Sequence, residues 1–307
     1  MKHLLKMSDL TAGELLHLLD VADELKADRK AGRPHPLLTG KTLALIFAGH
    51  STRTRTSFQV GMYQLGGMAD HLNAETELQL GRGEDVADTA RTLGCYYDGI
   101  LVRTANHKDA EALAKWSGVP VINGMTDYAH PCQVVADLMT IREKLGGFEG
   151  RKLCFIGDGN GLANSLITGG LMAGMDVTMV CPEGCEPGPS VLRWAQNYGE
   201  RFVLSYDPVA GVRDADVVYT DAWLSGAGGE SEKLLRRKFF RGYQVNRTLL
   251  ANAKPDCMVL HCLPARKGEE ITADVFEAHA AEIFEQTENR LHAQKAVLAV
   301  EAAVAGS

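Results

Sequence analysis

Hydrophobic residues along this chain form short continuous runs that alternate with segments of helical spacing. Continuous runs predict buried strands, because helices cover both faces of a parallel sheet. Between the runs, apolar residues recur every three or four positions, as in the helix expected after Thr11, where Thr11 and Glu14 match a capping box. The expected strands lie at 42–47, 69–72, 99–103, 119–122, 152–156, 202–205, 217–220 and 258–261, with another ending near Cys181.

A pair of glycines, Gly146 and Gly147, separates two series of alternating strands and helices. Each series predicts an α/β domain with a doubly wound parallel sheet, so we expect two such domains with an active-site cleft between them. The first domain should cover residues 1–145 and the second residues 146–285. The alanine-rich segment 286–307 should form a helix that packs back towards the first domain.

The segment 51–57 (STRTRTS) places hydroxyl side chains beside Arg53 and Arg55, between the strand at 42–47 and a helix expected to stop at Gly66. A helix N-terminus presents free backbone N–H groups and the positive end of the helix dipole. Hydroxyl donors and the two-pronged guanidinium of Arg53 complete a set suited to a phosphate. A single Ser or Thr here is better explained as a helix cap, but the whole cluster predicts a local anion site.

Two further parts of the first half carry side chains suited to the same site. Arg103 ends an expected strand, and HPCQ at 130–133 opens a helix, with Pro131 at the first helical position, where its missing N–H costs nothing. His130 and Gln133 lie three residues apart and can face one site. Alone, His130 would be read as a helix cap or a surface histidine.

In the second half, Asn160, Asp221 and Cys262 each follow an expected strand. Ligands of parallel sheets bind beyond the carboxyl ends of the strands, so these residues predict a second site. Cys262 could alternatively be a covalent nucleophile or a small buried residue. Its neighbour His261 should point to the opposite face of the strand, which favours an orienting role for Cys262.

The turn at 157–161 (GDGNG) has a partial likeness to the glycine-rich turn of dinucleotide-binding proteins. That pattern needs glycine or alanine at position 162, which is leucine, although Glu183 lies near the place of a ribose-binding acid. The alternative is a tight turn with close packing. An oxidoreductase is therefore a rival class of function, but it leaves the segments 51–57 and 130–133 without a role.

Composition narrows the class of function further. A net charge of −7 over 307 residues argues against a general nucleic-acid-binding surface. No apolar run approaches a membrane span, and the first residues contain no apolar signal core. The seven cysteines are odd in number, and Cys181 and Cys185 lack the partners of a zinc site. We expect a cytoplasmic protein with reduced thiols, no bound metal, and no nucleic-acid or membrane partner.

Four separated segments resemble the transcarbamoylase family: STRTRTSF at 51–58, HPCQ at 130–133, DAWLSG at 221–226 and HCLPA at 261–265. HCLPA favours the ornithine branch over the aspartate branch, as does ENRLHAQKA at 288–296. The resemblance implies transfer of the carbamoyl group of carbamoyl phosphate to the δ-amine of L-ornithine, giving L-citrulline and phosphate in arginine biosynthesis. It also implies a homotrimer with active sites at subunit interfaces, and no cofactor.

The resemblance assigns roles to the residues at matching positions. The catalytic residues are Arg53, Arg103, His130, Asp221 and Cys262. The carbamoyl phosphate-binding residues are Ser51, Thr52, Arg53, Thr54, Gln79, Arg103, His130, Gln133, Cys262, Leu263 and Arg290, with Gln79 contributed by a neighbouring subunit. The ornithine-binding residues are Asn160, Asp221, Ser225 and Gly226. A cis peptide bond is implied before Pro264.

Two segments depart from the ornithine branch, whose members usually carry Ser-Met-Gly after the Asp-x-Trp segment and Asn-Asn after Gly-Asp-Gly. Here Ser225 is followed by Gly226, and Asn160 by Gly161. Because these segments recognise the amine, putrescine or an N-acylated ornithine is the alternative acceptor. A non-catalytic homologue that binds carbamoyl phosphate is a third possibility. Ornithine is the first choice because the other acceptor positions match.

Overall fold

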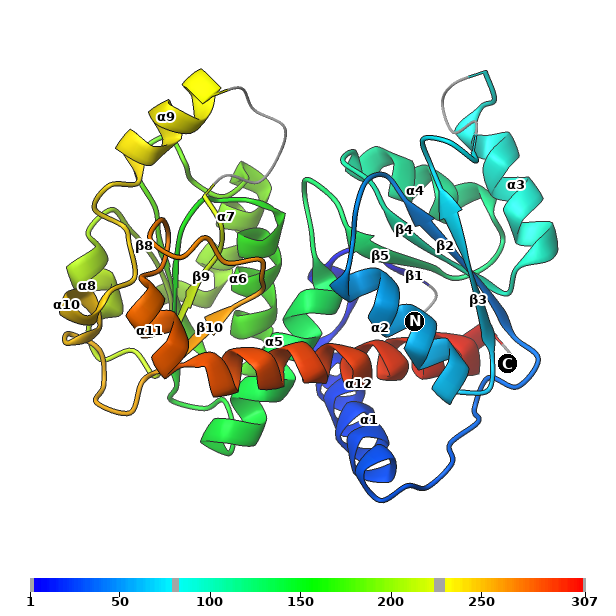
Figure 1. Cartoon of the computed structure of the whole chain (residues 1–307), viewed down its shortest axis with the longest axis horizontal. Helices are drawn as coiled ribbons and strands as arrows, with labels where there is room; N and C mark the ends of the chain where they lie inside the picture. The colour runs from blue at the N-terminus through cyan, green and yellow to red at the C-terminus, as the bar shows by residue number, and fades with distance from the viewer. Residues whose placement is uncertain (1–2, 79–82, 224–229, 306–307) are drawn as a thin grey trace. The chain divides into compact units, whose positions relative to one another are not determined.

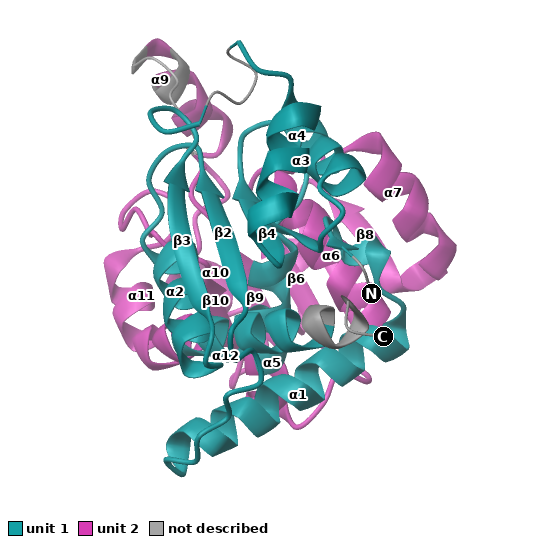
Figure 2. Cartoon of the chain, turned by 90° about the vertical axis from the view of Figure 1, so that its right-hand side faces the viewer, with its two compact units in different colours: residues 1–139, 288–307 teal, residues 140–287 magenta. Residues whose placement is uncertain are grey.

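The chain folds into two compact units, coloured separately in Figure 2. Unit 1 comprises residues 1–139 and 288–307, and unit 2 comprises residues 140–287. Helices α5 (Pro131–Leu145) and α12 (Ala280–Ala305) each carry the chain from one unit into the other. The computed structural model describes residues 3–78, 83–223 and 230–305.

Unit 1 contains one sheet of five parallel strands in the order β1-β5-β4-β2-β3 (Figure 1). Its strands are β1 (His3–Leu4), β2 (Thr42–Phe47), β3 (Met68–Asn73), β4 (Gly99–Arg103) and β5 (Val121–Met125). Its other elements are a short 3-10 helix (Met7–Asp9), α1 (Ala12–Lys30), α2 (Arg53–Gln64), α3 (Val86–Tyr96) and α4 (His107–Trp116).

Helices cover the sheet of unit 1 through buried apolar contacts. Leu93 of α3 and Leu113 of α4 share one hydrophobic cluster with Ile100 of β4. Helix α2 packs against the part of α12 that belongs to unit 1, where a Cβ at Gly61 would lie 3.3 Å from Lys295 Cγ. This packing places α12 directly beside α2 within unit 1.

Unit 2 repeats the architecture, with five parallel strands in the order β10-β9-β6-β7-β8. Its strands are β6 (Lys152–Ile156), β7 (Asp176–Val180), β8 (Phe202–Ser205), β9 (Val217–Thr220) and β10 (Met258–His261). Its helices are α6 (Gly161–Ala173), α7 (Pro189–Ala195), a 3-10 helix (Gln196–Arg201), α8 (Pro208–Val212), α9 (Glu230–Phe239), α10 (Arg247–Leu250) and α11 (Ala273–Ala278).

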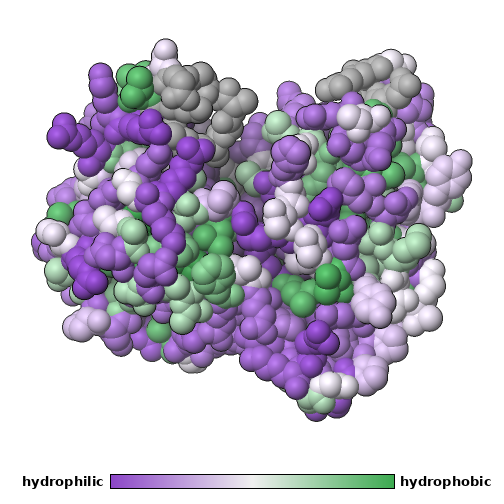
Figure 3. All heavy atoms as spheres, in the orientation of Figure 1, coloured by the Kyte–Doolittle hydropathy of each residue, from purple (hydrophilic) through white to green (hydrophobic). Residues whose placement is uncertain are grey.

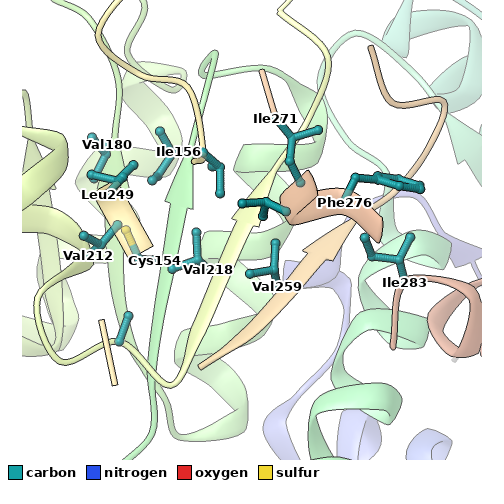
Figure 4. Close-up of a cluster of buried hydrophobic side chains, with 13 residues drawn as sticks. Cys154, Ile156, Val180, Val212, Val218, Leu249, Val259, Ile271, Phe276 and Ile283 are labelled. Carbon is teal, nitrogen blue, oxygen red and sulfur yellow. The ribbon is translucent and has the colours of Figure 1, made fainter. Parts of the chain in front are cut away.

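The core of unit 2 lies on both faces of its sheet. Figure 4 shows one cluster, in which Val218 of β9 and Val259 of β10 share a buried face with Phe276 of α11. Helix α6 packs closely elsewhere on the sheet, because a Cβ at Gly170 would lie 2.9 Å from Val177 Cγ2. On the molecular surface, hydrophilic residues cover most of the face drawn in Figure 3. Across the described ranges, the helices include none with the length and apolarity to span a membrane.

Both sheets reverse their direction of strand addition at one place. In unit 1 the chain passes from β2 to β3 and then crosses to β4, on the other side of β2; in unit 2 the same reversal occurs about β6, between β7 and β9. Ligands of parallel sheets bind at the carboxyl ends of the strands beside such a reversal. The prediction of two α/β domains with parallel sheets is confirmed, and the topology marks the ends of β2 and β4, and of β6 and β9, as binding sites.

Most element predictions agree with the structure, and the differences have local causes. The capping box is confirmed, because Thr11 Oγ1 accepts the Glu14 N–H at 3.2 Å and the Glu14 carboxylate accepts the Thr11 N–H at 2.7 Å. The strand expected at 119–122 is instead Val121–Met125. It continues past residue 122 because the side chain of Asn123 is buried and donates to the carbonyl oxygens of Leu5 (2.8 Å) and Ala129 (3.1 Å). The last helix starts at residue 280, before the segment expected to form it.

Candidate active site

Helix α2 begins at the predicted anion-binding turn. Thr52 is its N-cap residue, and the Thr52 side chain makes no capping hydrogen bond within the described part of the chain. The N–H groups at the start of α2 are therefore not capped by this residue. Ser57 is engaged inside the helix, because its hydroxyl donates to the Arg53 carbonyl oxygen at 2.5 Å. Of the two arginines in the turn, Arg55 is exposed and Arg53 is partly buried.

Two more guanidinium groups converge on the hydroxyl of Thr54, which is 1% exposed. Arg290 of α12 donates from Nη2 to Thr54 Oγ1 at 2.5 Å, and Arg103 at the end of β4 donates from Nη1 to the same oxygen at 3.4 Å. A hydroxyl that accepts from two cations keeps its own proton for a third partner. Three elements that are far apart in sequence thus bring two cations and one hydroxyl donor to a single point.

His130, directly before α5, lies within the same group of cations. Burial and then the positive charges of Arg290, Arg103 and Arg53 hold the pKa of His130 well below its ordinary value of 6.5. The imidazole is therefore neutral at physiological pH, with one N–H donor and one acceptor. We call Thr54, His130 and these three arginines the cation cluster.

Gln133 lies in the first turn of α5 and is held in one orientation by Asp137. Its Nε2 donates to Asp137 Oδ1 at 2.9 Å, and both side chains are fully buried. This bond leaves Gln133 Oε1, which has no hydrogen-bond partner among the described residues, as an acceptor. A buried acceptor without a partner is costly unless a ligand supplies a donor.

Asn160, Asp221 and Cys262 form one hydrogen-bonded group at the ends of β6, β9 and β10. Asn160 Nδ2 donates to Asp221 Oδ2 at 3.2 Å, and the Cys262 thiol donates to Asp221 Oδ1 at 3.0 Å. The Ala222 N–H donates to Oδ1 at 2.7 Å. Three donors therefore fix the orientation of the carboxylate, which suits it to accept a hydrogen bond from an amine or ammonium group.

His261 is held by Glu270 and does not act on Cys262. Its Nδ1 accepts the Leu263 N–H at 2.8 Å, and its Nε2 lies 3.1 Å from Glu270 Oε1. Because both nitrogens are engaged, the imidazole is not available as a base for the thiol or as an open metal ligand. The prediction that His261 and Cys262 point to opposite faces is wrong: Cys262 lies beyond the end of β10, and polar atoms of Asp221, His261 and Cys262 lie within 4.8 Å of one another.

The backbone after Cys262 has an unusual conformation that the same two residues support. Leu263 has a left-handed φ of 61°, and the predicted cis peptide bond joins it to Pro264. A left-handed φ in a residue other than glycine costs about 1–3 kcal/mol and persists only when neighbouring groups enforce it. Here His261 accepts the Leu263 N–H, and Glu270 Oε1 accepts the Arg266 N–H at 2.5 Å.

The glycine-rich turn after β6 serves capping and packing. Asn160 Oδ1 accepts the N–H groups of Leu162 (2.9 Å) and Ala163 (3.1 Å), which a pyrophosphate would otherwise use. A Cβ at Gly159 would lie 2.2 Å from the carbonyl carbon of Glu186, so the close approach requires glycine. These contacts explain the turn without a dinucleotide and remove the support for an oxidoreductase.

The predicted site residues separate into two groups. Unit 1 contains Ser51, Thr52, Arg53, Thr54, Arg103, His130, Gln133 and Arg290, and unit 2 contains Asn160, Asp221, Cys262 and Leu263. Gln79, Ser225 and Gly226 lie outside the described residues. Sequence reasoning missed Asp137 and Glu270. The spacing of Gln133 and Asp137, four residues apart on one helix, could have indicated the first pair, whereas the irregular segment between β10 and α11 gave no signal for Glu270.

Both halves of the chain match models of one protein family. Residues 2–143 match the domain described as "Aspartate/ornithine carbamoyltransferase, carbamoyl-P binding domain". Residues 149–300 match "Aspartate/ornithine carbamoyltransferase, Asp/Orn binding domain". The first match covers all five strands of the unit 1 sheet, and the second covers all five strands of the unit 2 sheet.

Individual relatives agree over nearly the whole length. The chain is 51% identical to the ornithine carbamoyltransferase of Thermococcus kodakarensis, over 97% of this chain and 96% of that protein. It is 52% identical to the anabolic ornithine carbamoyltransferase of Pyrococcus furiosus, with the same coverage. A solved structure of ornithine carbamoyltransferase from Pyrococcus furiosus superimposes with a TM-score of 0.93 at 53% identity, covering 97% of this chain and 96% of that one. The Thermus thermophilus enzyme gives a TM-score of 0.88 at 40% identity, covering 98% and 99%. The chain therefore belongs to the aspartate/ornithine carbamoyltransferase family.

Proposed function

We propose that this protein transfers the carbamoyl group of carbamoyl phosphate to the δ-amine of L-ornithine, producing L-citrulline and phosphate. The observation that carries the proposal is the cation cluster, which combines phosphate-binding guanidinium groups with neutral donors for a carbonyl oxygen. The match of the unit 1 strands to a carbamoyl phosphate-binding domain supports the donor. The names of the relatives support ornithine as the acceptor.

In this proposal, unit 1 binds the donor. Arg53, with Ser51, Thr52 and the N–H groups at the start of α2, holds the phosphate. Thr54, Arg103 and His130 donate to the carbonyl oxygen, where negative charge grows as the carbon becomes tetrahedral. Loss of one such donor typically lowers turnover by about 10²–10³-fold.

The carbamoyl NH₂ group needs acceptors as well as donors around it. Because Asp137 holds the Gln133 Nε2 group, Gln133 Oε1 is suited to accept a hydrogen of the carbamoyl NH₂ group. Leu263 and Cys262 contribute further contacts to the carbamoyl group, and Arg290 reaches the same group through Thr54. A wrong orientation of the Gln133 amide would place a donor against the NH₂ group, which is why the bond to Asp137 matters.

Unit 2 binds the acceptor and prepares its amine. An alkyl ammonium titrates near 10, so a proton must leave before the nitrogen can attack. Asp221, fixed by Asn160 and Cys262, positions the amine and assists this loss, and Ser225 and Gly226 contact the amino-acid end. The amine nitrogen adds to the carbamoyl carbon to give the tetrahedral state; the bond between this carbon and the phosphate oxygen then breaks, and the second proton released from nitrogen leaves with phosphate.

We also propose a cytoplasmic homotrimer that serves arginine biosynthesis, with Gln79 of a neighbouring subunit completing each active site. Unit 1 has an open sheet edge at β3, where Met68 is 58% exposed, and Tyr63 near the end of α2 is 81% exposed. Open edges and exposed apolar side chains are features that association covers. All seven cysteines lie among the described residues and none of them forms a disulfide, which supports a reducing compartment. The word "anabolic" in the name of the Pyrococcus furiosus relative supports the biosynthetic direction.

A panel of acceptors tests the reaction. With saturating carbamoyl phosphate, phosphate release should be fastest with L-ornithine, compared with N-acetyl-ornithine, N-succinyl-ornithine, putrescine, lysine and aspartate. The reason is that Asp221 and its donors suit a primary amine, while the relatives' names favour ornithine among amines. If putrescine, an acylated ornithine or aspartate gave a higher kcat/KM than ornithine, that compound would be the acceptor. If no compound released phosphate, the protein would bind carbamoyl phosphate without catalysing its transfer.

The donor site is tested by replacing each arginine of the anion-binding turn. Arg53→Ala should weaken carbamoyl phosphate binding by about a hundredfold or more, because a charge-assisted, two-pronged contact is lost. The matched control is Arg55→Ala, which removes an exposed arginine from the same turn and should leave the Kd unchanged. Isothermal titration calorimetry measures both. Equal effects of the two substitutions, or full activity of Arg53→Ala, would contradict the assignment.

The lowered pKa of His130 predicts how its protonation depends on pH. Its pKa is lowered, so the ring of the ligand-free protein should stay neutral throughout the range from about pH 6 to 9 instead of gaining a proton near 6.5. Acid should then destabilise the fold below pH 6.5, because unfolding lets this ring bind a proton. Histidine NMR signals recorded against pH, with His130→Asn to identify the signal, measure the titration. A midpoint near 6.5 would show that neither burial nor the three arginines lower the pKa of His130.

A further inference from the structure

Helix α9 reaches the acceptor side of unit 2 through one arginine. Arg236 Nη1 donates to Asp158 Oδ2 at 2.7 Å and to the carbonyl oxygen of Trp223 at 3.0 Å. The Asp158 side chain is 16% exposed and the Arg236 side chain 34%, so this pair is better shielded than a surface ion pair. A single cationic nitrogen therefore joins the segment that follows β6 to the segment that follows β9.

An aromatic contact supports the same connection. The rings of Trp223 and Phe240, the residue after α9, stack with centroids 5.3 Å apart and planes 20° apart. Trp223 is 4% exposed and Phe240 fully buried. This contact anchors the C-terminal end of α9 and so fixes the backbone position from which the Arg236 side chain extends to Asp158 and Trp223.

Both acceptors of Arg236 are near neighbours of the proposed ornithine-binding residues. Asp158 lies two residues before Asn160, and the Asn160 N–H donates to the Asp158 carbonyl oxygen at 2.8 Å. Trp223 lies two residues after Asp221. Asn160 and Asp221 are themselves joined at 3.2 Å. Hydrogen bonds and the short chain segment from Asp221 to Trp223 therefore connect these four residues and Arg236 in a closed loop.

We propose that Arg236 is a positioning residue for the acceptor. It holds the ends of β6 and β9 together, and so fixes the distance and orientation between Asn160 and Asp221. Without it, Asp158 would be a shielded carboxylate with one cationic partner fewer, and the two segments would lose their shared anchor. A displacement of about 1 Å at a binding group can lower the rate about a hundredfold. This inference rests on the proposed function, because it assigns unit 2 to the acceptor.

The neighbouring residue provides a contrast within the same helix. Arg237 also forms an ion pair of 2.7 Å, but its partner is Glu269, and the Arg237 side chain is 42% exposed. The two arginines therefore have the same chemistry and comparable pair lengths. Of the two arginines, it is Arg236 that contacts the segments that carry Asn160 and Asp221. A general loss of helix stability should affect both substitutions, whereas positioning of the acceptor should depend on Arg236 alone.

Steady-state kinetics on the full-length protein test the inference, with each substrate varied at saturating levels of the other. Arg236→Gln should raise the KM for ornithine about tenfold or more, with a smaller fall in kcat and a KM for carbamoyl phosphate within about twofold of the wild-type value. Arg236→Lys, which keeps the charge and several N–H donors, should restore an intermediate KM for ornithine. Arg237→Gln should change neither KM.

A double substitution tests whether Arg236 acts through Asp158. Asp158→Asn should raise the KM for ornithine in the same direction, and the Arg236→Gln/Asp158→Asn pair should be less than additive, because each change breaks the same ion pair. The inference would be overturned if Arg236→Gln left the KM for ornithine unchanged. It would also be overturned if Arg236→Gln raised both KM values equally and had a melting temperature well below that of Arg237→Gln. If Arg236→Gln does not fold, Arg236→Lys decides. Wild-type protein that does not carbamoylate ornithine would instead overturn the proposed function.

Discussion

Three guanidinium groups around the buried His130, two of which donate to the buried hydroxyl of Thr54, are the constraint on which unit 1 depends. Arg53, Arg103 and Arg290 carry like charges, and their repulsion grows as water is excluded. They stay in place because a helix start, a strand end and a long helix fix their backbones independently. Burial, and then the positive charge of these arginines, lowers the pKa of His130 and keeps its ring neutral. A bound phosphate would offset this repulsion, so the cluster is complementary to an anion.

Unit 2 uses the same topology for the opposite charge. Its two central strand ends carry Asp158 and Asp221 where unit 1 carries arginines, although both sheets reverse at the same kind of position. Asp221 accepts from Asn160 and Cys262, and Asp158 is paired with Arg236. One carboxylate is thereby paired with a cation of the protein, and the other is oriented by neutral donors, as the proposed contact with an amine requires. The fold supplies the position of each site, and the residues at the strand ends supply its specificity.

The sequence predicted the sheets well because most strands of a covered parallel sheet are continuous apolar runs, and it predicted the anion turn because its residues are consecutive. The sequence did not predict contacts between segments that are far apart along the chain. Arg290 meets Thr54 across 236 residues, and only the family resemblance indicated it. Glu270 contacts the buried His261, and Arg236 pairs with the partly buried Asp158, and no spacing rule predicts either contact. The end of β5 was also not predicted, because Asn123 interrupts the apolar run. In the structure its buried amide donates to backbone carbonyl groups, so the strand can continue.

The central claim is that unit 1 binds the carbamoyl phosphate end and unit 2 the amino-acid end of one reaction. Hydrogen-exchange mass spectrometry with a bisubstrate analogue, in which a phosphonoacetyl group is joined to the δ-nitrogen of L-ornithine, tests it most directly. The account predicts slower exchange at 51–57 in unit 1 and at both 157–163 and 221–223 in unit 2, whereas phosphonoacetamide alone should protect only the first segment. Protection by the bisubstrate analogue that stays within one unit would contradict the account.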